Sequence, residues 1–120
     1  MPINEMSVKF QSEPPSDLDI AVLDDEMPLF EGWWKTRSPN ANLFTSPDSF
    51  LDWLDQRGQN RPACVIDLHL NHAASGIDVI RTISPATNLY LATSDHLNAE
   101  ALEVAALYGV AILPKALLFS

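Results

Sequence analysis

The fold of this chain is decided by the stretch CVIDLHL at Cys64–Leu70. It begins with an apolar run rich in branched side chains, which is typical of a strand buried on both faces in a parallel sheet. The run ends at one carboxylate, Asp67, and burying a carboxylate without a partner is costly. We therefore place Asp67 at the C-terminal end of the strand, because open α/β sheets bind their ligands at that edge.

Size, composition and charge limit the possible classes of protein. A chain of 120 residues that is 47% hydrophobic can form one domain with its own core. The net charge of −9 argues against binding to nucleic-acid phosphates, which requires clustered Lys and Arg. Cys64 is the single cysteine, so an internal disulfide and a multi-cysteine metal site are excluded. No apolar run has the length of a membrane span and no signal peptide opens the chain, so we expect a cytoplasmic protein.

Strands and helices are predicted to alternate along residues 19–120. Apolar runs predict strands at residues 20–23, 42–45, 63–66, 89–92 and 110–113. Apolar residues at helical spacing predict one helix in each interval between these strands. This alternation predicts an α/β fold with a doubly wound, five-stranded parallel sheet and helices on both faces. Residues 1–18 are polar, contain two consecutive prolines and are predicted to form a flexible N-terminal arm.

Local signals mark ends of three predicted helices. Pro28 suits the first turn of the first helix, where its missing N–H costs nothing. Ser46 is expected to cap the second helix, with Pro47 as its first residue, and Gly58 to end it. Gly109 is expected to end the last helix. The apolar positions of the first helix are Leu29, Phe30, Trp33 and Trp34.

Polar side chains follow four of the five predicted strands. Asp24 and Asp25 follow the first, Asp67 the third, Thr93 the fourth and Lys115 the fifth. Three neighbouring carboxylates repel one another, and a Mg2+ ion among them relieves that repulsion. A carboxylate beside Mg2+ can attack a phosphoryl group and form an aspartyl phosphate. The hydroxyl and ammonium groups at the other strand ends could then hold the phosphoryl oxygens.

Four short motifs occur in order at these strand ends: VLDDE at 22–26, VIDL at 65–68 with Gly76 behind it, LATS at 91–94 and LPK at 113–115. With them, the sequence resembles the receiver domains of two-component response regulators, the CheY-like family, over about residues 19–115. The resemblance implies a flavodoxin-like sheet with strand order 2-1-3-4-5. It also implies that Asp67 is the phosphoacceptor, Thr93 the switch hydroxyl and Lys115 the phosphate-binding lysine. The implied Mg2+ ligands are the carboxylates of Asp24, Asp25 and Asp67 and the backbone carbonyl of His69.

The function expected from this resemblance is a phosphoacceptor switch. A histidine kinase or a phosphotransfer protein would supply the phosphoryl group, and a protein–protein contact would read it out. The domain would not be an enzyme beyond slow autophosphorylation from small donors and autodephosphorylation.

The sequence departs from the family pattern in several places, and two of the departures affect the fold and the readout. The usual fifth helix has no sequence, which resembles the truncated receivers associated with sensor histidine kinases, and Ile112 stands near the place of the usual aromatic switch residue. Without that helix, Trp33, Trp34 and residues 117–119 are expected to be partly uncovered. The N-terminal arm, a second copy of the chain in a homodimer or another protein would then cover them.

Other interpretations of these residues remain open at the sequence level. In one alternative, Asp24 and Asp25 cap the helix that follows them and have no other function. In another, His69, His72 and His96 form a zinc site instead of lying in solvent. The domain could also be a pseudo-receiver, a binding or dimerisation module that works without phosphorylation. A Mg2+-dependent phosphatase on a related fold is a further alternative, although His69 stands where its second acid would be expected.

Overall fold

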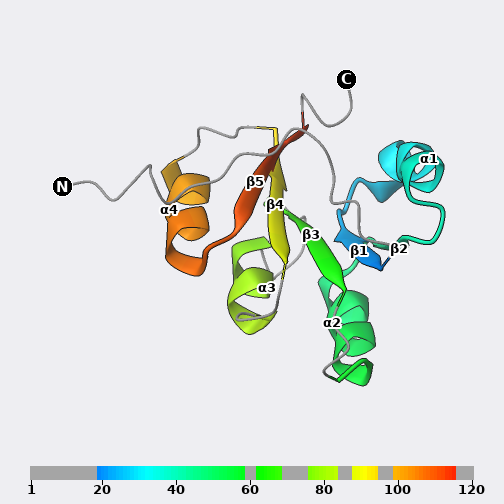
Figure 1. Cartoon of the computed structure of the whole chain (residues 1–120), viewed down its shortest axis with the longest axis horizontal. Helices are drawn as coiled ribbons and strands as arrows, with labels where there is room; N and C mark the ends of the chain where they lie inside the picture. The colour runs from blue at the N-terminus through cyan, green and yellow to red at the C-terminus, as the bar shows by residue number, and fades with distance from the viewer. Residues whose placement is uncertain (1–18, 59–61, 69–75, 84–87, 95–98, 116–120) are drawn as a thin grey trace.

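A five-stranded parallel sheet forms the centre of the fold (Figure 1). In this computed structural model the described residues are 19–58, 62–68, 76–83, 88–94 and 99–115, so the predicted N-terminal arm lies outside them. The five strands are β1 (Ile20–Leu23), β2 (Asn42–Phe44), β3 (Ala63–Asp67), β4 (Leu89–Thr93) and β5 (Ala111–Pro114). Their order is β2-β1-β3-β4-β5 and every neighbouring pair is parallel, which confirms the predicted fold class and strand order.

Helices cover the two faces of the sheet unequally. The helices are α1 (Met27–Arg37), α2 (Pro47–Gln56), α3 (Gly76–Ile83) and α4 (Ala99–Tyr108). Side chains of α2, α3 and α4 enter one core cluster, whereas α1 contributes to the other, so α1 lies on the opposite face (Figure 1). The described ranges contain four helices. None of these four helices could cross a membrane, being too short or too polar.

The strands β1 and β3 show why a continuous apolar run forms a central strand. Every residue of both strands is buried, and Val22 pairs with Val65 in the parallel register. Successive side chains of a strand point to opposite faces of the sheet, so Ala21 and Leu23 belong to one core cluster while Ile20 and Val22 belong to the other. A strand between two helical layers therefore needs apolar residues at successive positions.

The helix ends agree with the sequence signals in all but one detail. Pro28 lies in the first turn of α1, and Gly58 and Gly109 have positive φ angles of 61° and 66° just beyond α2 and α4. Ser46 occupies the N-cap position of α2, but its side chain makes no capping hydrogen bond. The expected side-chain cap was therefore wrong; the Ser46 carbonyl instead accepts the Phe50 N–H at 3.1 Å.

The buried stripe of α1 differs from the predicted one. Leu29 is 74% exposed, whereas Met27 is buried and Trp34 is only 1% exposed. Met27, Phe30 and Trp34 follow the i, i+3, i+7 spacing of one helix face, while Leu29 lies off this stripe. The expectation that Trp34 is partly uncovered was therefore wrong. Trp33 is half-buried, and residues 117–119 lie outside the described residues.

Candidate functional site

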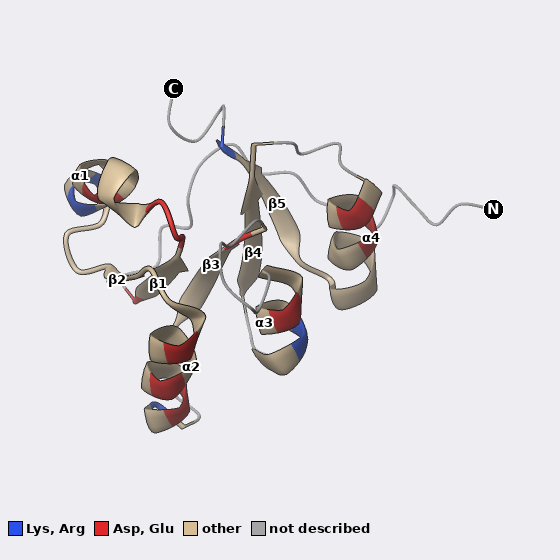
Figure 2. Cartoon of the chain, turned by 180° about the vertical axis from the view of Figure 1, so that it is seen from behind, with Lys and Arg blue, Asp and Glu red and all other residues tan. Residues whose placement is uncertain are grey.

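The predicted site residues meet at the C-terminal edge of the sheet. Asp24 directly follows β1, Asp67 is the last residue of β3, Thr93 is the last residue of β4 and Lys115 directly follows β5. The register pairs Asp67 with Ala92, which places Thr93 one residue further along the neighbouring strand. Figure 2 shows the acidic turn after β1 and the basic position at the end of β5 on this edge.

Three carboxylates form a cluster that fits one small divalent cation. One oxygen from each of Asp24, Asp25 and Asp67 lies within 4.8 Å of the other two. Asp24 and Asp67 are 3% and 5% exposed, and Asp25 is half-buried. Two oxygens bound to one octahedral Mg2+ lie about 2.9 Å apart when adjacent and about 4.2 Å apart when opposite, so the three carboxylates would close in further around an ion.

Lys115 supplies the positive charge beside this cluster. Its Nζ lies 2.9 Å from Oδ2 of Asp24 and 3.1 Å from Oδ1 of Asp67, and its side chain is 11% exposed. The other oxygen of Asp24, Oδ1, accepts the backbone N–H of Glu26 at 2.9 Å. Asp24 is therefore fixed from both sides, by the turn that starts α1 and by the lysine that follows β5.

Burial and charge change the protonation of the central pair. Burial, together with the charges of Asp24 and Asp25, outweighs the opposing effect of Lys115 and raises the pKa of Asp67 to about 7. For Lys115, burial alone would lower the pKa. The hydrogen bond to Asp24 and the charge of Asp67 together outweigh burial, so the pKa of Lys115 is raised above 10.5 and the side chain stays an ammonium.

The backbone beyond Asp67 is tied to two neighbouring elements. The Leu68 N–H donates to the Ala92 carbonyl at 3.0 Å, and the Leu68 carbonyl accepts the Gly76 N–H at 3.2 Å. A Cβ atom on Gly76 would lie 2.0 Å from the carbonyl oxygen of Asp67, so the start of α3 packs directly against Asp67. Glycine is required here because no side chain fits between the two backbones.

The remaining predicted residues are placed only in part. Thr93 is buried at the end of β4. His69, whose carbonyl was predicted as a metal ligand, lies outside the described residues, as do His72 and His96 of the alternative zinc site. Sequence reasoning missed Phe30, whose ring centroid lies 5.3 Å from the Nζ of Lys115, because no motif links two residues so far apart in the chain.

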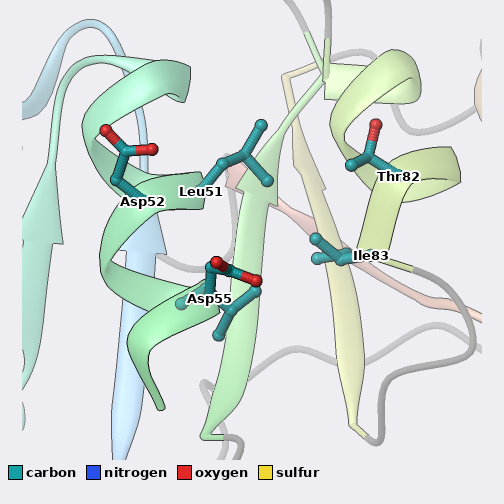
Figure 3. Close-up of a pocket in the computed structure, with 6 residues that line it drawn as sticks. Leu51, Asp52, Asp55, Thr82 and Ile83 are labelled. Carbon is teal, nitrogen blue, oxygen red and sulfur yellow. The ribbon is translucent and has the colours of Figure 1, made fainter. Parts of the chain in front are cut away.

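A separate hollow of about 290 Å³ lies between α2 and α3 (Figure 3). Its apolar lining comes from Leu51, Leu54 and Ile83, and its polar lining from Asp52, Asp55 and Thr82. It shares no residue with the carboxylate cluster. Its exposed Asp52 therefore offers a matched control for charge changes at Asp67.

The fold is that of solved receiver domains. In a comparison with solved structures, the BeF3-activated receiver domain of DrrB matches with a TM-score of 0.56 and 22% identity, covering 84% of this chain and 91% of that domain. The response regulator DrrB of Thermotoga maritima, an OmpR/PhoB homolog, matches with the same score and identity, and the match covers 49% of its chain.

The likeness to DrrB establishes that this chain has the receiver fold, as predicted from its motifs. Neither a scan against profiles of known protein families nor a search of curated proteins gives a match for this sequence.

Proposed function

We propose that this chain is a receiver domain of a two-component system and that Asp67 is its phosphoacceptor. The observation that carries the proposal is the meeting of three carboxylates within 4.8 Å with an ammonium group that touches two of them. A buried site of this composition is costly unless it binds a cation and an anion together. A Mg2+ ion and a phosphoryl group are such a pair.

The residues divide the chemistry of phosphoryl transfer among them. A carboxylate oxygen of Asp67 attacks the phosphorus, the P–N bond to the donor histidine breaks, and the released imidazole keeps the electron pair and takes up a proton. Mg2+, held by Asp24, Asp25 and Asp67, would supply positive charge against the phosphoryl oxygens when bound. Lys115 lies close enough to Asp67 to donate to a phosphoryl oxygen, and its raised pKa keeps it charged.

The added charge makes the domain a switch. A phosphoryl group brings about −1.5 to −2 charges to the end of β3 and draws donors such as Lys115 and Thr93 towards it. The resulting shift of β4 and β5 is read by a partner protein. We propose a cytoplasmic protein that receives its phosphoryl group from a histidine kinase or a phosphotransfer protein and is also able to form a homodimer. Its own catalysis is limited to slow reaction with small donors and slow self-hydrolysis.

Intact-mass analysis tests the proposal directly. The wild type, Asp67→Asn and the control Asp52→Asn are incubated with Mg2+ and either acetyl phosphate or phosphoramidate, whose P–N bond resembles that of phosphohistidine. One phosphoryl mass is expected on the wild type and on Asp52→Asn, and none on Asp67→Asn or in excess EDTA. No mass gain from either donor or from histidine kinases would overturn the proposal in favour of a pseudo-receiver. Turnover of small phosphate esters would favour the phosphatase alternative.

A further inference from the structure

We propose that Phe30 is a positioning residue for Lys115, a role that rests on the proposed function of Asp67. Phe30 belongs to α1, while Lys115 follows β5 at the other end of the chain. The Nζ of Lys115 lies 5.3 Å from the centroid of the Phe30 ring, inside the range of about 6 Å at which a cation is attracted to an aromatic ring face.

Three contacts of the Lys115 ammonium are described, and the Phe30 ring is the one among them that has no part in the proposed phosphoryl transfer. The other two, at 2.9 and 3.1 Å, are carboxylate oxygens of Asp24 and Asp67. Both carboxylates are assigned to the metal, and Asp67 is also assigned to the phosphoryl group. When the two carboxylates bind the metal ion or the phosphoryl group, their attraction for the Lys115 ammonium weakens, whereas the attraction of the Phe30 ring remains.

A lysine needs such a constraint because its side chain is long and flexible. Ordering it costs rotamer entropy. Phe30 is held in place because it packs against the core cluster on the α1 face of the sheet. A fixed aromatic face beside the ammonium keeps Lys115 near Asp67 and excludes water from one side of it, which strengthens its charge towards a phosphoryl oxygen.

Three variants separate the ring face from simple packing. Phe30→Leu keeps apolar volume but removes the ring, Phe30→Tyr keeps the ring, and Leu29→Ala changes an exposed neighbour in the same helix. If Phe30 only fills space, the Leu and Tyr variants should behave alike at Lys115. If its ring positions the lysine, the Tyr variant should resemble the wild type and the Leu variant should not.

The position of the lysine can be read without any phosphorylation. The sequence contains three lysines, Lys9, Lys35 and Lys115, so selective 13C-lysine labelling gives a simple NMR spectrum, and the Lys115 signal is the one lost in Lys115→Met. Ring currents should shift its ε-protons upfield in the wild type, in Phe30→Tyr and in Leu29→Ala, but not in Phe30→Leu. An unshifted signal in the wild type, or the same shift in Phe30→Leu, would overturn the proposal even if a variant folds poorly.

Kinetics then tests what the positioning does. The rate of Asp67 phosphorylation by acetyl phosphate is expected to fall about 5-fold in Phe30→Leu, the equivalent of about 1 kcal/mol, and to be restored in Phe30→Tyr. Equal rates in both variants would contradict the positioning role. If the wild type is not phosphorylated at all, the proposed function fails; a ring-current shift would then still establish where Phe30 holds the lysine, so the two failures are distinguishable.

Discussion

The ammonium of Lys115 lies 3.1 Å from a carboxylate oxygen of Asp67, although β4 separates their two strands in the sheet. The lysine side chain therefore reaches past the end of β4, where Thr93 is buried. This one contact links the ends of β3 and β5 above the strand between them. A change of charge at Asp67 can thus reach β5 directly, without passing through the hydrogen bonds of the sheet.

Neutralising Asp67 is expected to stabilise the domain at high pH. The folded-state pKa of Asp67 is about 7 and its ordinary value is 3.8, so the folded protein holds this proton more tightly than the unfolded chain. The contribution of this proton to the free energy of unfolding is complete below about pH 3.8 and is lost as the pH rises through about 7. The stability advantage of Asp67→Asn over the wild type should therefore widen by about 3 kcal/mol between pH 5 and pH 8.

Urea denaturation in EDTA at both pH values measures this difference. Asp52→Asn, which removes an exposed carboxylate from α2, should show no comparable widening. An Asp67→Asn variant that is less stable than the wild type by the same amount at both pH values would contradict the expected desolvation of Asp67.

Mg2+ is expected to stabilise the domain through the carboxylate cluster. With a dissociation constant near 1 mM, 10 mM Mg2+ would add about 1.4 kcal/mol to the free energy of unfolding, because only the folded state gathers the three acids. Asp24→Asn should lose most of this gain, since it removes one ligand from a cluster of three. Urea denaturation at pH 8 with and without Mg2+ gives the comparison. An equal gain in Asp24→Asn would place the ion elsewhere.

Removing the lysine should have opposite effects on stability and on metal affinity. Lys115→Met leaves Asp24 and Asp67 buried without their counter-charge, which should cost about 3 kcal/mol in EDTA at pH 8. The same change frees both carboxylates for a cation, so Mg2+ should bind more tightly than in the wild type and recover part of the loss. Titration followed by fluorescence of Trp33 and Trp34 measures the affinity. Lys35→Met, at an exposed position of α1, is the control. Weaker Mg2+ binding by Lys115→Met would contradict the expectation that the lysine and the ion compete for the same carboxylates.

Two glycines should respond oppositely to the same substitution. Gly76→Ala places a Cβ atom 2.0 Å from the Asp67 carbonyl oxygen and should destabilise the domain by roughly 3 kcal/mol, because backbone must move. Gly32→Ala lies within α1 with no atom within 4 Å of the added Cβ, so it should stabilise by about 0.5–1 kcal/mol. Thermal unfolding of both variants tests the pair. A similar loss for both would indicate that helix packing, and not contact with Asp67, sets the effect.

The sheet could be predicted because its strands leave a strong local pattern. Runs such as residues 63–66 are apolar at successive positions, and strand order followed from motifs that resemble receiver domains. The acids and the lysine could be placed together because parallel strands bring their C-terminal ends to one edge. Their contacts, such as the 2.9 Å distance between Lys115 and Asp24, depend on side-chain rotamers and could not be predicted.

The details of α1 were harder to predict because the helix is apolar on more than one side. Leu29 and Trp34 are both apolar, and only packing against the sheet decides that Trp34 is buried and Leu29 exposed. The contact between Phe30 and Lys115 joins the first helix to the residue after the last strand, and no local pattern reports it. The missing side-chain cap at Ser46 has a similar cause, since the hydroxyl orientation is not fixed by residue type.

The contact between Gly76 and the Asp67 carbonyl also offers a way to find distant relatives. A comparison of whole sequences weighs every position alike and loses its signal when most positions have changed. The close approach of the two backbones leaves room only for glycine at position 76, whichever residues change elsewhere in the chain. A search that asks for an acid at a strand end and a glycine at the start of the next helix would therefore detect kinship that overall identity conceals.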